Sequence, residues 1–401
     1  MKEKLIIKNF GPIKSVDLDL GKITVLIGEQ ATGKSTIAKV LSVCRYFSYI
    51  VNFTNKETEL NKFTENLQFS DGLKDWGIDG YLKENSEIIY KNDLYTFEFK
   101  TEHIVEFETL ATPNDYKKEF FQTHTRLEST SKVFTELLNQ LQNLKKDELE
   151  DENDFFELLG WTPNENFFRL NVKKVMSNPL FIPAERGFQS LSVGKDSLLP
   201  DSIIDELAKI NKIVRGYQSD INIKPLNLIF RNDHGLSKIK KSNENDFYYL
   251  HQGASGYQST IPIVLAIKYY SEIEKRKRTF IVEEPEINLF PSTQEKLMQF
   301  FVENLNSNGH SFLIPTHSPY FLSAINDLLV AHKRGQQNEK ETEKIIKKEA
   351  WLNPEDLSVY ELKKGEAYDI FDKKLGLISD NIIDDVSDEM NDEFERLLDI
   401  K

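Results

Sequence analysis

The chain has 401 residues, a formal net charge of −14 at pH 7 and a hydrophobic fraction of 39%. Its apolar residues are sufficient for a core, and its 27 Phe and 15 Tyr set it apart from a disordered chain. The acidic balance excludes a general nucleic-acid coat, so any DNA contact is expected at local basic patches.

Cysteine content and hydropathy narrow the class of protein further. The single cysteine, Cys44, excludes an internal disulfide and a multi-cysteine zinc site. The first residues show no signal-peptide pattern, and no apolar run reaches the roughly 18 residues of a transmembrane helix. We therefore expect a soluble cytoplasmic protein without membrane contact.

The N-terminal pattern predicts three strands and a helix. Residues 4–10 and 15–20 have the composition and alternation of half-buried strands, and residues 23–27 are β-branched or apolar throughout. Apolar residues continue over 37–41 as one face of a helix. Two antiparallel strands thus precede the third strand, an order that differs from a simple β–α–β kinase.

Residues 28–36, Gly-Glu-Gln-Ala-Thr-Gly-Lys-Ser-Thr, fit the phosphate-binding pattern G-x-x-x-x-G-K-[ST]. A strand, a glycine-rich turn and a helix N-terminus direct backbone N–H groups and the positive end of the helix dipole toward phosphate. In this pattern Lys34 reaches the β- and γ-phosphates of a nucleotide, and the Ser35 hydroxyl ligates Mg²⁺. The candidate phosphate-binding residues are Gly28, Gln30, Ala31, Thr32, Gly33, Lys34, Ser35 and Thr36.

Residues 47–180 are predicted as an insertion. Residues 87–107 alternate around the turn at Asn92-Asp93 and predict a β-hairpin. Residues 115–159 predict a helical arm of modest length, because an apolar stripe is present but heptads are not sustained.

Beyond the insertion the pattern of strands and helices resumes. We expect a strand at 179–183 and a helix at 201–214. Two further strands are expected at 226–230 and 247–250, joined by a loop that carries the basic residues 238–241.

Three motifs follow, each beside a predicted element. Ser-Gly-Tyr-Gln at 255–258 precedes an apolar helix. One β-branched strand ends in Glu-Glu-Pro-Glu at 283–286, and another ends in Thr-His-Ser-Pro at 316–319. The C-terminal region predicts a hairpin over 359–370 and an acidic amphipathic helix over 380–398.

With the P-loop, these motifs in this order resemble the ABC-type ATPase domain. The pattern looks like that of RecF/SMC/OLD-type ATPases, which count among the AAA-family ATPases of bacterial DNA repair and phage defence. The resemblance covers residues 1–45 and 180–330 well, and the acidic tail loosely. It implies an α/β fold, in which a P-loop head with a mixed sheet and an antiparallel β-subdomain carries a helical arm insertion and a small C-terminal extension. It also implies ATP and Mg²⁺ as cofactors.

The resemblance assigns a role in trans to the first of the later motifs. Ser255, with Gly256 and Gln258, stands at the signature motif, whose serine contacts the γ-phosphate of ATP bound to the other subunit. Ala254 and Tyr257 depart from the Leu and Gly that this motif usually carries.

The resemblance also assigns the catalytic and metal-binding residues. Glu283 stands at the Walker B position that ligates Mg²⁺, where Glu in place of Asp leaves a direct or a water-bridged bond open. Glu284 matches the residue that polarises the attacking water, and His317 matches the switch histidine. Gln189 or Arg186 corresponds to the Q-loop, which senses Mg²⁺.

We therefore expect four regions: an ATPase lobe with the P-loop over 1–46, the insertion over 47–180, a lobe with the other motifs over 181–330, and the extension over 331–401. The expected function is ATP hydrolysis in a head-to-head homodimer or higher homo-oligomer that senses or gates a separate effector, nuclease or toxin-like. One alternative is an OLD-type nuclease, although the residues after 330 lack the strand–Glu-Gly and Asp-x-Asp patterns of a Toprim domain. The other is an ATP-gated scaffold with negligible turnover.

Overall fold

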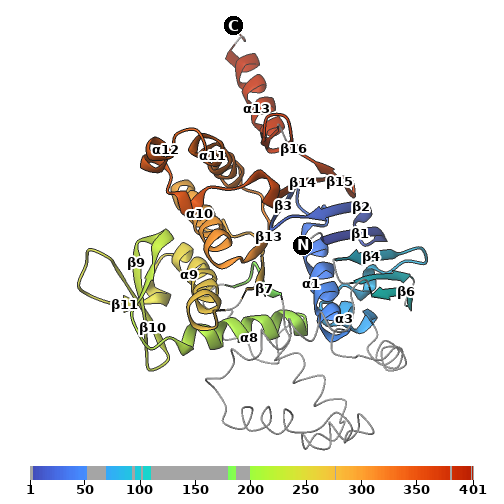
Figure 1. Ribbon diagram of the computed structural model, residues 1–401, viewed down its shortest axis with the longest axis horizontal. Coiled ribbons are helices and arrows are strands. Elements are labelled where there is room, and N and C mark those ends of the chain that lie inside the picture. The colour runs from blue at the N-terminus through green and yellow to red at the C-terminus, as the bar shows by residue number, and fades with distance from the viewer. Residues whose placement is uncertain are drawn as a thin grey trace, which may run out of the picture.

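The computed structural model of the protein describes residues 3–51, 69–92, 95–100, 103–109, 179–186, 199–275, 277–379, 382–398 and 400. In this part of the chain the main feature is an 11-stranded mixed sheet with the order β6-β5-β4-β1-β2-β15-β14-β3-β13-β12-β7. A separate four-stranded antiparallel sheet lies to one side of it (Figure 1). The expected α/β fold with an antiparallel subdomain is thus confirmed, whereas the arm predicted over 115–159 lies outside the described residues.

The antiparallel part of the main sheet consists of β1 (Glu3–Phe10), β2 (Ile13–Leu20), β4 (Glu87–Lys91), β5 (Tyr95–Lys100) and β6 (His103–Thr109). β1 pairs with both β2 and β4, and Leu5 and Ile7 on its inner face are fully buried. The hairpin predicted over 87–107 is confirmed as β4–β5, and β6 adds a further strand beside β5.

The parallel part of the sheet consists of β3 (Ile23–Gly28), β7 (Leu180–Ile182), β12 (Thr279–Val282), β13 (Ser311–Pro315) and β14 (Leu357–Lys363). These strands read as apolar runs because helices cover both faces of a parallel sheet. β3 is flanked by β13 on one side and β14 on the other, and both pairings are parallel.

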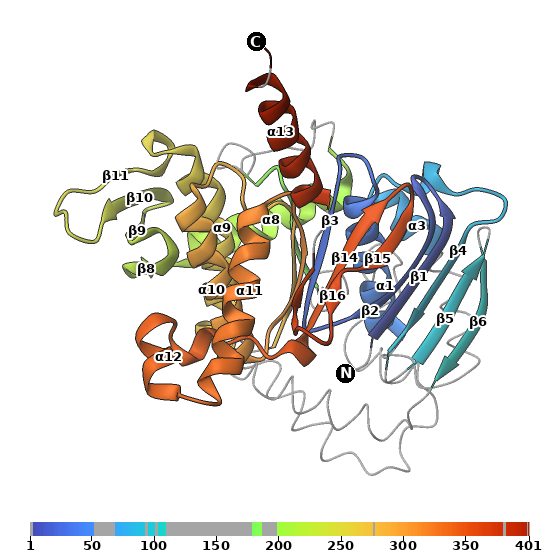
Figure 2. The same ribbon diagram turned by 90° about the horizontal axis from the view of Figure 1, so that it is seen from above.

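The main helices are α1 (Lys34–Val51), α3 (Phe69–Asp75), α8 (Asp201–Gly216), α9 (Ser255–Lys268), α10 (Pro291–Asn308), α11 (Pro319–Gly335) and α12 (Glu339–Ile345). α10 joins β12 to β13, and α11 follows β13. Figures 1 and 2 show α1 on one face of the parallel strands and α10 and α11 on the other. Among the helices that the structure describes, none combines the length and the hydrophobicity of a membrane span.

The four-stranded sheet consists of β8 (Ile221–Ile223), β9 (Leu228–Asp233), β10 (Leu236–Lys241) and β11 (Tyr248–Tyr249). The prediction that the basic residues 238–241 form a loop is wrong, because they belong to β10 and pair with β9. Ile239 fills the core from this strand, while Lys238 forms an ion pair with Asp233 at 2.6 Å. The sequence pattern indicates this strand only weakly because Ile239 is its only buried apolar residue.

The C-terminal region adds β15 (Glu366–Asp369), β16 (Phe371–Asp372), β17 (Leu377–Ile378) and α13 (Ile382–Leu398). The predicted hairpin over 359–370 is confirmed as β14–β15. Because β14 pairs with β3, the region expected as an extension supplies a central strand of the main sheet.

A buried histidine just before β13 contacts the segment between α9 and β12. The Nδ1 of His310 accepts a hydrogen bond from the Arg278 backbone N–H at 3.1 Å, and its Nε2 lies 2.9 Å from the Ser271 hydroxyl. Because Nδ1 is an acceptor, the ring is neutral and carries its proton on Nε2. Burial, together with the charge of Arg278, lowers the pKa of His310 to about 4.

Acid should therefore destabilise the protein through His310. The unfolded chain binds a proton on this ring near pH 6.5, whereas the folded ring stays neutral down to about pH 4. This contribution is fully present above pH 6.5 and is lost as the pH falls toward 4, by up to about 3 kcal/mol. His310→Gln should remove that part of the pH dependence, measured by urea unfolding between about pH 7 and pH 4.5. If the free energy of unfolding changes with pH in the same way in the wild type and in His310→Gln, the prediction is wrong.

Candidate functional site

Four loops that follow adjacent parallel strands meet at one edge of the main sheet. β3, β13, β12 and β7 are neighbours in this order, and all are paired in parallel. Their carboxyl ends lead into loops 29–33, 316–318, 283–290 and 183–186. The carboxyl ends of parallel strands are where open α/β sheets bind ligands, and all four loops carry residues singled out from the sequence.

The loop between β3 and α1 has a backbone that ordinary residues rarely adopt. Gly28 has a φ of +144°, and a Cβ there would lie 2.5 Å from the Leu362 carbonyl oxygen of β14. Gly33 has a φ of +106° and Ala31 a φ of +60°. Turned backbone units of this kind direct N–H groups into a concavity that suits phosphate.

Lys34, the first residue of α1, is held inside this loop. It is 6% exposed, and its Nζ donates to the carbonyl oxygens of Gly28 and Glu29, both at 2.8 Å. Burial lowers its pKa to about 8, against the opposing charges of Glu284 and Glu286. A phosphate in the loop would give this ammonium an anionic partner in place of neutral carbonyls.

Glu283 and Ser35 form a pair that fits a hard cation. Glu283 is 5% exposed and is hydrogen-bonded to Ser35, and its Oε1 lacks a hydrogen-bond partner in the described part of the chain. Burial raises the pKa of this carboxyl. A hydroxyl and a carboxylate are oxygen ligands of the kind that Mg²⁺ takes alongside substrate phosphates, so the donor set fits the predicted metal.

Glu284 and His317 lie side by side at the ends of β12 and β13. The Glu284 carboxylate is 3.6 Å from Nε2 of His317, and the two side chains are 39% and 34% exposed. Glu284 has a φ of +42°, a strained value for a residue other than glycine, and its N–H donates to the Pro315 carbonyl at 2.9 Å. Burial and the charge of Lys34 lower the pKa of His317, whose ring is hydrogen-bonded to the Gly28 carbonyl. The result is an accessible carboxylate beside an imidazole that favours its neutral form.

Polar side chains from three elements fix the backbone around His317. Glu286 accepts a hydrogen bond from the His317 N–H at 2.7 Å and is also hydrogen-bonded to Thr316. Ser318 caps the N-terminus of α11 and is hydrogen-bonded to Gln294 of α10. The loop after β13 is therefore anchored both to the loop after β12 and to α10.

The Ser-Gly-Tyr-Gln motif begins α9. Ser255 is its first residue and is exposed, so the helix N-terminus presents N–H groups that can bind an anion. Gly256 packs against the loop after β12, where a Cβ would lie 2.4 Å from the Asn288 carbonyl oxygen. The Gln258 amide donates to two carbonyl oxygens of the preceding turn, at 3.0 and 3.3 Å, and thereby orders the approach to the helix.

Arg186 joins these parts and is fully buried. Its Nε donates to the Ser259 carbonyl of α9 at 3.0 Å. Its Nη1 donates to the carbonyls of Pro183 and Glu283 at 3.0 and 2.7 Å, and its Nη2 donates to that of Glu284 at 2.8 Å. Burial lowers its pKa to about 10. One guanidinium thus ties the signature helix, the loop after β7 and the backbone of both glutamates together.

The remaining predicted site residues make fewer contacts within the site. Thr32 donates from its hydroxyl to the Glu29 carbonyl at 2.8 Å, and Thr36 is buried. Gln30 is exposed at the surface of the loop. Gln189, one of the two Q-loop candidates, lies outside the described residues.

Sequence reasoning missed three of the residues that order the site. Glu286 and Thr316 were part of quoted motifs, but nothing in the linear pattern assigned them to the switch loop. Gln294 lies on an amphipathic helix, where a single buried glutamine gives no signal. Arg186 was noted only as a Q-loop alternative, although its contacts are with backbone carbonyls and not with a metal site.

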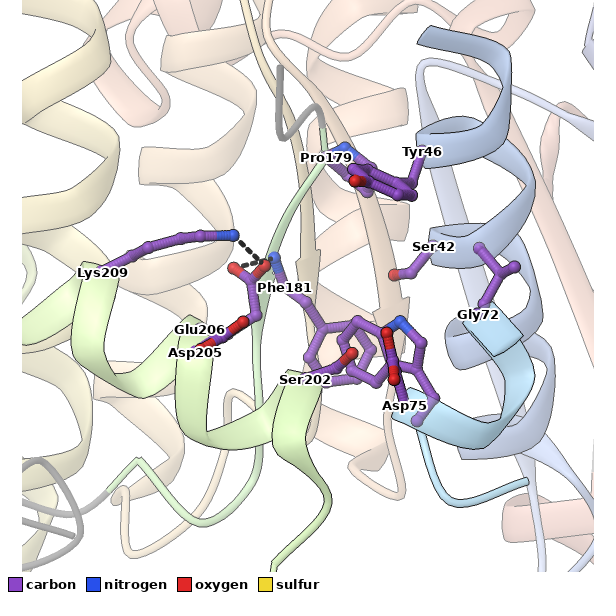
Figure 3. A pocket seen from close by; sticks show the side chains of 12 residues that line it. Ser42, Tyr46, Gly72, Asp75, Pro179, Phe181, Ser202, Asp205, Glu206 and Lys209 are labelled. Carbon is purple, nitrogen blue, oxygen red and sulfur yellow. Dashed lines mark hydrogen bonds and ion pairs between the residues drawn. The ribbon is translucent and has the colours of Figure 1, made fainter. Parts of the chain in front are cut away.

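A separate small cavity lies between α1, α3, β7 and α8, and no residue of the P-loop lines it (Figure 3). Glu206 and Lys209 of α8 lie on one side of it, and Ser42 of α1 lies on the other. Glu206 accepts a hydrogen bond from the Phe181 N–H at 3.3 Å and pairs with Lys209 at 2.6 Å. α8 thereby covers the open edge of β7, the last strand of the main sheet.

Removal of Arg186 should cost far more stability than removal of a surface arginine. Arg186→Met removes the donor from four carbonyl oxygens, and three of these hydrogen bonds are buried, so the free energy of unfolding should fall by about 3 kcal/mol or more. Arg231→Met is the matched control, because Arg231 is exposed and pairs with Asp220 at the surface, so its replacement should change the free energy of unfolding little. Urea unfolding at neutral pH measures both, and equal losses would contradict the central role of Arg186.

Residues 1–322 match the AAA_15 family model, described as an AAA ATPase domain. No curated protein matches the chain. The SMC head domain from Thermotoga maritima is 12% identical, with a TM-score of 0.38, and the match covers 92% of this chain and 98% of that one. A Smc head bound to the C-winged helix domain of ScpA is 10% identical, with a TM-score of 0.41 and coverage of 92% and 96%. A Smc head with an extended coiled coil, bound to the C-terminal domain of ScpA derived from Pyrococcus furiosus, is 9% identical, with a TM-score of 0.36 and coverage of 92% and 95%.

These structural likenesses are distant, and the family assignment rests on the sequence match. That match extends from the first strand to α11 and includes the P-loop, the signature motif, the paired glutamates and the switch histidine. The resemblance to an AAA-family P-loop ATPase is thereby confirmed. The chain belongs to the AAA_15 family of AAA ATPase domains.

Proposed function

We propose that the chain binds and hydrolyses ATP in a head-to-head dimer that gates a partner protein. The observation that carries this proposal is the convergence of Lys34, Glu284 and His317 at neighbouring strand ends, with the last two 3.6 Å apart. Phosphoryl transfer requires positioning and electrostatic stabilisation more than covalent chemistry. This group of side chains is suited to both.

Binding of the triphosphate is the task of the P-loop. The backbone of residues 28–33 and the Lys34 ammonium hold the β- and γ-phosphates. Ser35 and Glu283 would hold Mg²⁺, which when bound offsets the phosphate charge and orients the γ-phosphate. The buried, unpartnered oxygen of Glu283 supports this assignment.

Hydrolysis is assigned to Glu284 and His317. The exposed Glu284 carboxylate can accept a proton from the attacking water, for which it has to be ionised. His317 contacts the γ-phosphate with its ring. The strained backbone of Glu284 is held by Pro315 on one side and Arg186 on the other, which supports a preorganised position for this carboxylate.

The dimer is inferred from α9. The N-terminus of α9 is at the surface at Ser255, where it can meet the nucleotide of a second subunit. The close packing of Gly256 on Asn288 ties that helix to the loop that carries the glutamates. Closure of the dimer would thus act on both halves of a composite site.

The protein that the ATPase gates is proposed to be a separate effector, nuclease or toxin-like. Its role in anti-phage defence or DNA repair is inferred from the family resemblance. Direct DNA contact has little support in the described residues. The basic strand β10 has ion pairs between Lys238 and Asp233 and between Lys241 and Glu244, which weaken its attraction for phosphate.

Two substitutions should separate binding from hydrolysis. Lys34→Ala removes a charge that holds phosphate, so ATP affinity should fall by about 30-fold or more. Glu284→Gln keeps the size of the side chain but removes the proton acceptor, so hydrolysis should fall by about 100-fold or more while binding persists. Fluorescent-nucleotide titration and single-turnover hydrolysis measure the two quantities.

The same pair tests the rival reading of an ATP-gated scaffold. Wild-type protein that binds ATP but shows no single-turnover hydrolysis would support the scaffold. Unchanged hydrolysis in Glu284→Gln would move the catalytic role to another residue.

Mixed subunits should reveal a composite site. Ser255→Arg blocks the signature position, and Lys34→Ala disables the P-loop, so each variant alone should be inactive. In an equal mixture, half of the dimers combine one intact P-loop with one intact signature, so ATPase activity should recover to about a quarter of wild type. Full activity of Ser255→Arg alone would show that the chain works without a partner subunit.

A further inference from the structure

α13 stands off the rest of the protein, as Figures 1 and 2 show. Every side chain of this helix from Met390 to Leu398 is exposed. Met390 is 65% exposed, Phe394 62% and Leu397 65%, and with Leu398 they follow the spacing i, i+4, i+7 and i+8. They therefore lie on one face of the helix. Single exposed apolar residues are ordinary, but a continuous apolar face usually marks an interaction site.

The same helix is strongly acidic. Its 17 residues include seven carboxylates and one basic residue, Arg396, which gives a net charge of −6. At 100° per residue, Glu393 and Glu395 border the apolar face on its two sides, and Arg396 points away from it. The face thus has an apolar centre and an acidic rim.

Charge discriminates among the surfaces that could cover this face. The protein's own core does not cover it, since the side chains from Met390 onward are exposed. A second copy of α13 would bring two acidic rims together, which costs free energy through like-charge repulsion. Helices that lie on membranes carry Lys and Arg on their polar face, and anionic lipids would repel this one.

We propose that α13 is a docking helix for a separate protein that offers an apolar groove bordered by lysine or arginine side chains. In this mode of recognition, apolar residues at i, i+4 and i+7 anchor an amphipathic helix in a groove, while complementary charges set partner choice. The inference extends the proposed function, because it locates the contact with the gated partner. Docking itself requires no ATP hydrolysis.

The strand that precedes α13 lies against the helix that follows the switch histidine. The Ile378 N–H, in β17, donates to the Asn326 side-chain oxygen of α11 at 2.8 Å. α11 begins at Pro319, directly after the loop that carries His317. A partner bound to α13 would therefore be attached close in sequence to β17, which is hydrogen-bonded to α11.

The test uses the full chain and two synthetic peptides as probes. Both peptides contain about three heptads with Leu at positions a and d, and they carry either Lys or Glu at positions e and g. Fluorescence anisotropy should show that the Lys peptide binds at least about tenfold more tightly than the Glu peptide, and that added salt weakens binding.

Variants of α13 identify the surface. Phe394→Ser combined with Leu397→Ser should weaken binding of the Lys peptide by about tenfold or more, because the anchors are removed. Arg396→Gln is the matched control on the opposite side of the helix and should keep or increase affinity. Equal binding of the two peptides, or affinity unchanged in the double variant, would refute the proposal.

Two further measurements test whether a second copy of the chain or a membrane covers the apolar face of α13 instead. If nucleotide-free protein self-associates in light scattering and the double variant does not, the occupant is a second copy and the proposal fails. If phosphatidylcholine vesicles bind the wild type but not the double variant, the occupant is a membrane and it fails as well. The double variant should hydrolyse ATP at the wild-type rate, and Lys34→Ala should bind the Lys peptide normally. Peptide binding thus tests the docking proposal, and ATP hydrolysis tests the ATPase proposal independently.

Discussion

The organisation of the site depends on one buried guanidinium. Arg186 is the largest fully buried side chain in the described structure, and its four hydrogen bonds all end on backbone carbonyl oxygens. A charged group is expensive to bury unless it is satisfied, and dipoles of backbone carbonyls satisfy it without neutralising it. The side chains of Glu283 and Glu284 remain available for other partners because Arg186 binds their backbone only.

This arrangement separates support from chemistry. Backbone atoms hold the loops in place, together with side chains that bond to the loops and not to the reacting groups, such as Glu286 and Gln294. Lys34, Glu284 and His317 lie together at the ends of neighbouring strands. Stored strain at Glu284, with its φ of +42°, persists because hydrogen bonds on both sides of the residue determine its backbone.

Much of this could be predicted from sequence, since each motif is a contiguous stretch next to one strand or helix. The P-loop, the paired glutamates and His317 fall where their flanking patterns predicted. The strand β10 was missed because Ile239 is its only buried apolar residue, and the other buried position is Ser237. The contacts of Arg186 span separations of 73, 97 and 98 residues, and no local pattern encodes them. Only tertiary packing brings those carbonyls around one side chain.

The position of β14 has a consequence for how the protein is made. The P-loop strand β3 lies near the N-terminus, but both of its neighbours, β13 and β14, come from the last third of the chain. On the ribosome, β3 therefore emerges with two unpaired edges and remains so until β14 (Leu357–Lys363) has been translated. Such long-range pairing makes folding slow and leaves apolar strands open to wrong partners. Nascent chains of this protein should consequently depend on chaperones, and ATP can stabilise the fold only after β14 has been translated and has paired with β3.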